Sequence, residues 1–396
     1  MLMRTTLAGP LDVVELVGER ELPAIAEEWN ALAGEIAFRR YEWLATWWRN
    51  YRQPGDELLV VALRDAAGSL AGLAPWYVAR NRWSGRVVRT LGSGKVCSEY
   101  LTVLCHADTV ATVAQRLAEW LVDEGRDHWD LIEFCGVACD DPVMAALAGQ
   151  MGLRRHMVHQ RRQHATWRLE LPETWDELLS RLSGKRRSRV RAAERRMFDS
   201  GRAVVHRARS AADIHEGLGI LQHLHEQRRQ SLDDAGCFST PRFREFMHDA
   251  AERFLEADRL QLDWLQIDGR PAAVEFKLLG GDTVYYYQTG MEPSLAGESP
   301  GWLLQIASLR RAIDEGHRWF DFLRGDEGYK SAWGAGPLPL ADLRIVNRRL
   351  LAQWRHRLWL AGSRIKHWRR ANAENKSDLT TETGNPVIAA SVGRPS

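Results

Sequence analysis

The chain has 396 residues, 45% of them apolar and 27% charged, which is typical of a globular protein and excludes a collagen-like, wholly disordered or disulfide-scaffold chain. Its length favours two domains, since one domain usually takes ~100–200 residues. The 54 basic and 52 acidic residues leave a net charge of +2, so affinity for nucleic acid or membrane must come from local patches.

The cysteines and the apolar runs bear on location. Five cysteines without framework spacing favour reduced thiols in a cytosol. The segment Met1–Gly18 carries acidic residues and lacks an apolar core, so we predict no signal peptide. The longest uncharged apolar stretch, Leu70 to Ala79, is far short of the ~20 residues of a membrane-spanning helix.

The first half predicts alternating strands and helices. Strands are expected at 11–17, 57–64, 69–79, 87–91, 100–104 and 129–134, and helices at 21–33, 41–51, 109–124 and 142–151. The link Asp65-Ala66-Ala67-Gly68 has the chemistry of a hairpin turn.

The second half repeats this order. Strands are expected at 166–171, 259–267, 271–279, 283–288 and 318–323, and helices at 175–200, 212–230, 241–257 and 300–315. Asp268-Gly269 and Gly280-Gly281-Asp282 are predicted hairpin turns. We therefore predict a mixed α/β fold of two similar domains in tandem, 1–165 and 166–343, with largely antiparallel sheets flanked by helices.

The segment 344–370 predicts a basic amphipathic helix. It holds nine Lys or Arg, two His, three Trp and no acidic residue. Its apolar residues recur at spacings of three and four: Leu351, Trp354, Leu358, Ala361, Ile365 and Trp368. Such a stripe fits a membrane interface or the protein core, and the pattern leaves both open. The remaining 371–396 is predicted to be disordered.

Ser299-Pro300-Gly301 predicts a helix start, with Ser299 as N-cap, Pro300 at the first position and Gly301 leaving room for an approaching phosphate. The surrounding Gly-Glu-Ser-Pro-Gly also matches a hydrolase nucleophile elbow, but Pro300 has no N–H for an oxyanion hole. A plain helix cap remains the alternative. Cys135 and Cys139 form one isolated pair without zinc-site spacing, so no metal is expected.

Downstream, Asp321 lies on a predicted strand between Trp319 and Leu323. A carboxylate among apolar neighbours needs a partner, and we expect Arg324 or Lys330. A structural ion pair and a catalytic cluster are equally open.

These residues carry a resemblance to a known family. Ser299-Pro300-Gly301, a helix, then Phe320-Asp321-Phe322 with Arg324-Gly325 and Tyr329-Lys330 resembles the signature of the GNAT-like domain of CelD and FemAB-like proteins. The basic helix Lys185–Arg196 and the hairpin Asp268–Ala273 stand where that family has comparable elements. The match covers 166–343, and 1–165 is similar only to a diverged companion domain.

The resemblance implies an acyltransferase that moves an acetyl or other acyl group from a CoA thioester to an amine or hydroxyl. Ser299, Gly301 and Arg324 would then bind the donor, and Glu275 or Asp321 would accept the acceptor's proton. Tyr329 would protonate the leaving thiolate, with Lys330 in the same catalytic cluster. Tyr285 and Tyr287 would line the acceptor cleft, or belong to the core.

The same resemblance suggests an acceptor and a place of action. The family's association with envelope and exopolysaccharide synthesis suggests a polysaccharide, peptidoglycan precursor or lipid as acceptor, handled in the cytoplasm or at the inner face of the membrane.

Two alternatives remain. Arg181–Arg196 has eight basic residues against one acid, which suits a phosphate backbone, and FemAB-like relatives include transferases that use aminoacyl-tRNA. Apolar residues near helical spacing explain the same run as a solvated helix face: Leu178, Leu182, Val190, Ala193 and Met197. A non-catalytic GNAT-like binding scaffold is the second alternative.

Overall fold

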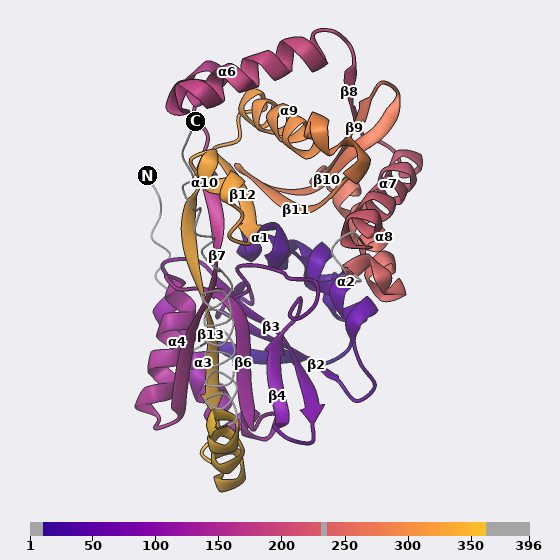
Figure 1. Ribbon diagram of the computed structural model, residues 1–396. Coiled ribbons are helices and arrows are strands. Elements are labelled where there is room, and N and C mark those ends of the chain that lie inside the picture. Colours follow the sequence, from indigo (N-terminus) through magenta and orange to yellow (C-terminus); the bar gives the residue numbers. More distant parts are fainter. Residues whose placement is uncertain (1–10, 231–235, 362–396) are drawn as a thin grey trace, which may run out of the picture.

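The computed structural model describes residues 11–230 and 236–361, and its strands form one continuous sheet (Figure 1). The order across the sheet is β1-β2-β3-β4-β6-β13-β7-β12-β11-β10-β9-β8, with β5 paired to β3. The strands are β1 (Asp12–Leu16), β2 (Glu57–Arg64), β3 (Leu70–Asn81), β4 (Gly85–Thr90), β5 (Leu104–Cys105), β6 (Leu131–Ala138), β7 (Met157–Glu170), β8 (Ala203–Arg207), β9 (Leu260–Ile267), β10 (Arg270–Gly280), β11 (Thr283–Met291), β12 (Trp319–Arg324) and β13 (Gly336–Val346).

Helices cover the faces of this sheet. The α-helices are α1 (Ala26–Ala33), α2 (Tyr41–Tyr51), α3 (Val110–Val122), α4 (Pro142–Leu153), α5 (Trp175–Arg181), α6 (Gly184–Ala193), α7 (Ala211–Gln230), α8 (Pro241–Glu256), α9 (Pro300–Asp314) and α10 (Gly328–Ala332), followed by a helix at 350–361.

The two halves have the same strand arrangement, which confirms the predicted mixed α/β tandem. An antiparallel series β2-β3-β4 ends on β6, which runs parallel to β4. In the second half the antiparallel series β9-β10-β11 ends on β12, parallel to β11.

Two long strands join the halves. β7 pairs along its length with β13, from Met157 opposite Val346 to Arg168 opposite Gly336. The end of β13 also pairs with β6, whereas the end of β7 pairs with β12, so each strand completes the sheet of the other half (Figure 1). The predicted boundaries at 165 and 343 therefore fall inside strands that both halves share.

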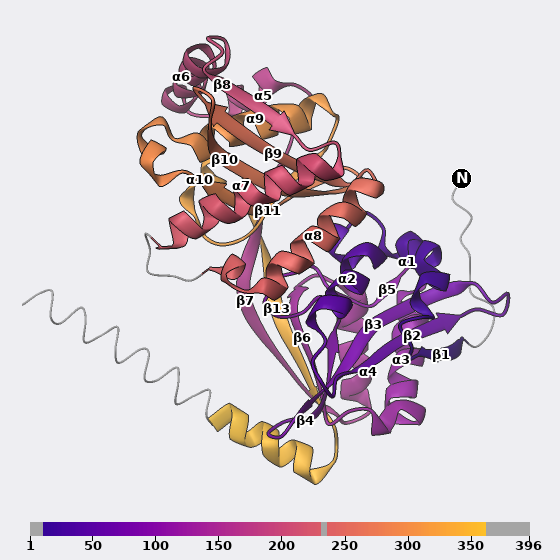
Figure 2. The same cartoon turned by 90° about the vertical axis from the view of Figure 1, so that its right-hand side faces the viewer.

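The halves also share a hydrophobic core. α2 and α8 lie side by side in Figure 2, and Trp43 packs edge-on against Phe246 at 4.8 Å between ring centroids. Phe38 contacts Tyr285 across the same junction. Separate cores lie under α3 and α4 in the first half and under α9 in the second.

Several predicted elements differ in detail. The predicted helix 175–200 breaks after Arg181, because Ser183 caps a new helix by accepting from the Arg186 N–H. All five apolar positions predicted for this run are buried. Of the predicted strand 100–104, only Leu104 is in a strand. β8, β13 and α10 were not predicted.

The predicted basic helix begins later than its segment. Arg344 to Val346 belong to β13, and the helix occupies 350–361. Ile365, Trp368 and the predicted disordered tail lie outside the described residues.

Candidate functional site

A cavity opens where two parallel strands separate. β11 pairs with β12 only from Thr283 to Tyr285, although β11 continues to Met291. In β12, Leu323 has φ 56°, a left-handed conformation that is rare for a leucine and turns the chain away from β11. The resulting space of about 540 Å³, here called the central cavity, is lined by β10, β11, α7, α9, the segment after β12 and a loop of the first half.

Lys330 holds the bend at the end of β12. Lys330 is 1% exposed. Its ammonium donates to the carbonyls of Leu323, Arg324 and Gly325 at 3.2, 2.7 and 3.0 Å. Gly325 has φ 111°, a conformation that disfavours any side chain. Lys330 also pairs with Glu327 at 2.9 Å, so this residue, predicted as catalytic, lies in the cavity wall with its ammonium already engaged.

Glu275 lies on β10 and lines the central cavity at 1% exposure. One of its oxygens accepts from Lys277 Nζ at 2.9 Å and from the Ser308 hydroxyl. The other oxygen, Oε1, has no hydrogen-bond partner within the described part of the chain. Such a carboxylate, fixed on one side and free on the other, can accept a proton from a bound group.

A buried ion network fixes this carboxylate. Lys277 Nζ also donates to Asp263 at 2.8 Å and to Ser308 Oγ at 2.6 Å. Burial lowers the pKa of Lys277, but the charges of Asp263 and Glu275 outweigh it and raise that pKa overall. Lys277 therefore stays charged and holds Glu275 in place.

Two tyrosines border the same space. The Tyr286 hydroxyl accepts from Gln305 Nε2 at 3.3 Å, and Gln305 in turn accepts from Trp333 Nε1. Burial raises the pKa of Tyr329 well above its usual range, and Tyr329 lines the cavity. Burial also raises the pKa of Tyr286 well above its usual range, so both hydroxyls stay protonated at neutral pH.

The first half contributes Glu99 to the cavity wall. Glu99 is fully buried, forms an ion pair with Arg324, and its second oxygen has no partner within the described residues. Burial raises the pKa of Glu99, against the lowering effect of Arg324. Arg324, predicted to bind the donor, therefore already has a carboxylate partner.

Asp321 lies outside the central cavity. It accepts from the Tyr100 hydroxyl at 2.6 Å, from Arg168 Nε at 3.0 Å and from the Leu323 N–H at 2.8 Å. Burial raises the pKa of Asp321, and the Arg168 charge opposes this. The predicted pairing of Asp321 with Arg324 or Lys330 was wrong, because its partners are Arg168 and Tyr100. Arg168 lies directly opposite Asp321 on the neighbouring strand β7.

The predicted acceptor tyrosines separate. Tyr285 is buried, packs on Phe38 and donates to the Glu35 carbonyl at 3.4 Å, outside the central cavity. Tyr287 lines the cavity and donates to the Val96 carbonyl at 2.6 Å.

The start of α9 opens on the cavity. Gly301 lines it, and a Cβ at that position would stand 3.4 Å from the Met291 sulfur, an ordinary contact. Ser299 occupies the N-cap position with φ 55°, but its side chain makes no capping hydrogen bond. The positive end of the helix dipole is thus directed at this region.

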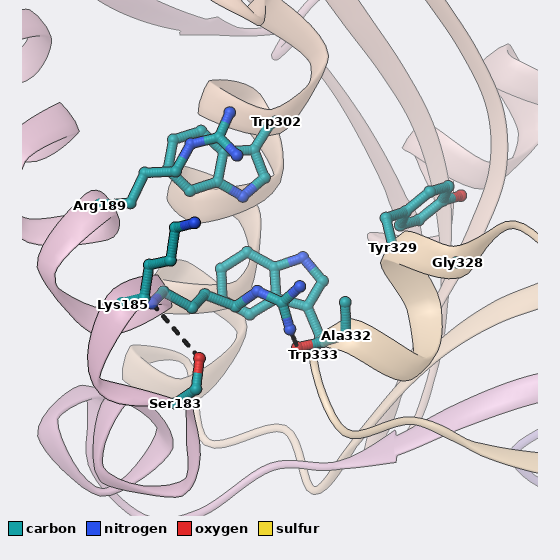
Figure 3. Close-up of a pocket in the computed structure, with 9 residues that line it drawn as sticks. Ser183, Lys185, Arg189, Trp302, Gly328, Tyr329, Ala332 and Trp333 are labelled. Atoms are coloured by element: carbon teal, nitrogen blue, oxygen red, sulfur yellow. Dashed lines mark hydrogen bonds between the residues drawn. The ribbon is translucent and has the colours of Figure 1, made fainter.

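A second hollow adjoins the first beside α6 (Figure 3). It measures about 460 Å³ and shares Trp302 and Tyr329 with the central cavity. We call it the basic hollow, because its walls carry three cations of α6: Lys185, Arg186 and Arg189. The Arg189 guanidinium lies 4.4 Å from the centre of the Trp302 ring. Cations beside flat aromatic faces suit a phosphorylated ligand with a planar ring.

Sequence reasoning missed Glu99, Tyr286 and Gln305. Alternation along 283–288 placed Tyr286 opposite Tyr285 and Tyr287, which was a usable signal. Nothing local marks Glu99. Within the described residues, no group of three or more His, Cys, Asp or Glu is placed to hold a metal ion.

Comparison with protein families matches part of the second half. Residues 184–331 match the family model described as an acetyltransferase (GNAT) domain. No curated protein matches the sequence. Residues 184–331 are therefore similar to a GNAT acetyltransferase domain, which agrees with the motifs of this half.

Three solved structures share the fold. FemX is 12% identical, with a TM-score of 0.60 over 87% of this chain and 100% of that one. A conserved protein of unknown function from Bacteroides thetaiotaomicron is 12% identical, with a TM-score of 0.53 over 85% and 100%. The C-terminal domain of a putative lysylphosphatidylglycerol synthetase from Agrobacterium fabrum is 10% identical, with a TM-score of 0.52 over 87% and 96%. At these identities the likeness concerns the fold alone.

Proposed function

We propose that the central cavity transfers an acyl group from an activated donor to an amine or hydroxyl. The observation that carries this is Glu275, a buried carboxylate that lines the cavity, with one oxygen fixed by Lys277 and the other without a hydrogen-bond partner in the described residues. A GNAT domain matched over 184–331 supports transferase chemistry.

The proposed step is an attack on the donor's carbonyl carbon. The acceptor's nitrogen or oxygen forms the new bond while Glu275 accepts its proton, and the bond from the carbonyl to the leaving sulfur or oxygen breaks. Burial raises the pKa of Tyr329 well above that of a thiol, so Tyr329 stabilises the leaving group by donating a hydrogen bond rather than by losing its proton.

The donor we favour is acetyl-CoA or a longer acyl-CoA. Its pyrophosphate would bind at the start of α9 near Gly301, and its phosphorylated adenosine in the basic hollow beside Trp302. Arg324 stands nearby, paired with Glu99. The chemistry needs no metal.

Calorimetry with acetyl-CoA tests this placement. Gly301→Glu puts a carboxylate beside the phosphates and should weaken binding by about tenfold or more, because like charges repel in a partly desolvated site. Gly301→Ala is the matched control and should stay within about twofold, since its Cβ makes only an ordinary contact with Met291. Equal affinity in both variants would place the donor elsewhere.

An aminoacyl-tRNA donor is the second candidate. The observation that favours it is α6, whose exposed Lys185 and Arg189 line the basic hollow and whose Arg191 is exposed on the same helix. Competition decides: aminoacyl-tRNA that displaces acetyl-CoA and supports turnover favours the second donor. Binding without turnover of either would favour the non-catalytic scaffold.

We keep a polysaccharide, a peptidoglycan precursor or a lipid as the proposed acceptor class, in envelope or exopolysaccharide synthesis. The similarity to CelD suggests this acceptor, and it stays a prediction. The cysteines of the described residues are all free thiols, and we propose the cytoplasm as the place of the reaction. Within the described residues, no helix is both long and apolar enough to cross a bilayer.

A further inference from the structure

Exposed large apolar side chains gather on the helix 350–361. Leu350, Leu351, Trp354 and Leu358 are between 52% and 85% exposed. Scattered single apolar residues are normal on a protein surface, but four on three turns of one helix form a patch.

The helix rests on the body through its opposite face. Ala352 and His356 are buried at 5% and 3% exposure. Trp359 stacks on His356 and lies 3.8 Å from the Arg344 guanidinium. The described members of the predicted stripe, Leu351, Trp354, Leu358 and Ala361, are all exposed, so the stripe is not what anchors the helix.

Other exposed apolar residues lie at the same end of the first half. Met157 starts β7 opposite Val346, the last residue of β13, and Leu153 ends α4 just before it. Arg355 on the helix lies against Gly85, beside the turn that carries Trp83 at 74% exposure. These seven are most of the exposed large apolar side chains in the described residues, and Figures 1 and 2 show the helix at this end, remote from the second half.

Basic residues border the apolar stripe. At 100° per residue, Arg355 and Arg357 fall on its two sides, and Arg348 precedes the helix. The Arg82 guanidinium lies 5.2 Å from the Trp83 ring. Arg349 is the exception, because it pairs with Asp127 and Asp130. The sequence has no acidic residue between Asp342 and Glu374.

We propose that this end of the first half, with the helix 350–361, docks on an anionic lipid surface. Tryptophan and leucine enter the headgroup boundary while flanking arginines contact the headgroups. The charge pattern favours this partner over a second copy of the chain, since a two-fold contact would bring the same basic patch, with Arg355 and Arg357, against itself. The docking is independent of which donor the central cavity uses.

Co-sedimentation of the full chain with vesicles tests the proposal. We expect binding to vesicles of phosphatidylcholine with phosphatidylglycerol, weak binding to phosphatidylcholine alone, and a loss of binding as salt rises. Trp354→Ser with Leu358→Ser should lower partitioning into the vesicles by about tenfold or more, because two apolar side chains that would enter the lipid are lost. Arg355→Gln with Arg357→Gln should lower it about fivefold per residue on anionic vesicles only.

Val204→Ser, at an exposed apolar position on the edge strand β8, is the matched control and should bind like the wild type. Thermal melting of each variant checks its fold, and we expect an unchanged melting temperature because all the substituted positions lie on the surface. A wild type that never sediments with anionic vesicles overturns the proposal. A dimer in light scattering that the serine variant dissociates overturns it as well, by assigning the surface to a second copy.

Discussion

The two halves carry the same parallel strand pair, and they treat it differently. In the first half, β4 and β6 pair at Val88 and Ile132, and immediately beyond, Arg89 binds Glu133 at 2.5 Å. Arg344 binds the same carboxylate at 2.7 Å. In the second half, β11 and β12 separate into a cavity of about 540 Å³. One arrangement of strands can therefore be closed by charges or opened for chemistry.

The strands β3 and β10, at corresponding places in the two halves, differ in the charges that they bury. The buried run Leu70–Val78 of β3 has no carboxylate or lysine, whereas β10 buries Glu275 and Lys277. Burying a charge is costly unless it is paired, so an unpaired oxygen on Glu275 indicates a role beyond packing. The first half instead contributes Glu99 to the wall of the central cavity.

Glu275→Gln tests whether the chemistry lies in the second half. We expect kcat to fall by about a thousandfold with KM little changed, because removing a general base costs about 10²–10⁴ in rate. Steady-state kinetics with the donor identified by calorimetry measures this.

Glu133→Gln is the matched control, since Glu133 is the ion-paired carboxylate at the closed strand pair. It should lower the free energy of unfolding and leave kcat of the folded protein within about twofold. Equal losses of kcat in both variants would contradict a chemical role confined to the second half.

Asp321→Asn tests a carboxylate that both halves contact, because Asp321 accepts hydrogen bonds from Tyr100 and Arg168. Asparagine leaves Arg168 without its charged partner, but it also removes a buried charge whose pKa burial raises, so the unfolding free energy should fall by less than about 3 kcal/mol, measured by urea denaturation. Turnover per folded molecule should stay within about threefold. A fall of about thirtyfold or more in a protein that still folds would instead place Asp321 in the chemistry.

Much of the fold could be predicted because local signals agree with tertiary structure. The Asp268-Gly269 turn and the alternation along β9, β10 and β11 gave correct strands, and 41–51 and 57–64 match their observed bounds. β13 was missed because Pro337 and Pro339 argue against a central strand. The polar start of β7, from Met157 to Gln163, lacks the alternation of a half-buried strand.

The site divides in the same way. Glu275 could be found because it alternates with buried Val274 and Phe276 on one strand. Glu99 could not, since its partner Arg324 lies more than two hundred residues away in the sequence. The misassigned partner of Asp321 has the same cause: Arg168 becomes a neighbour only when β7 crosses into the second half.

The ion network that holds Glu275 should respond to pH. Burial raises the pKa of Asp263, but Lys277 and Arg207 outweigh it and lower that pKa from 3.8 to about 2. A carboxyl with a lowered folded pKa stabilises the protein above its unfolded pKa, and this contribution is lost as pH falls through the folded one. The shift corresponds to about 2 kcal/mol, which should disappear between pH ~4 and ~2. Burial raises the pKa values of Glu99 and Asp321, so their protonation favours the folded state as pH falls and partly masks the loss.

Urea denaturation of wild type and Asp263→Asn at each pH therefore isolates the contribution of Asp263. We expect the difference in unfolding free energy to shrink by about 2 kcal/mol over this range. A difference that does not change with pH would mean that Asp263 is not held ionised by Lys277, and the fixed orientation of Glu275 would lose its support.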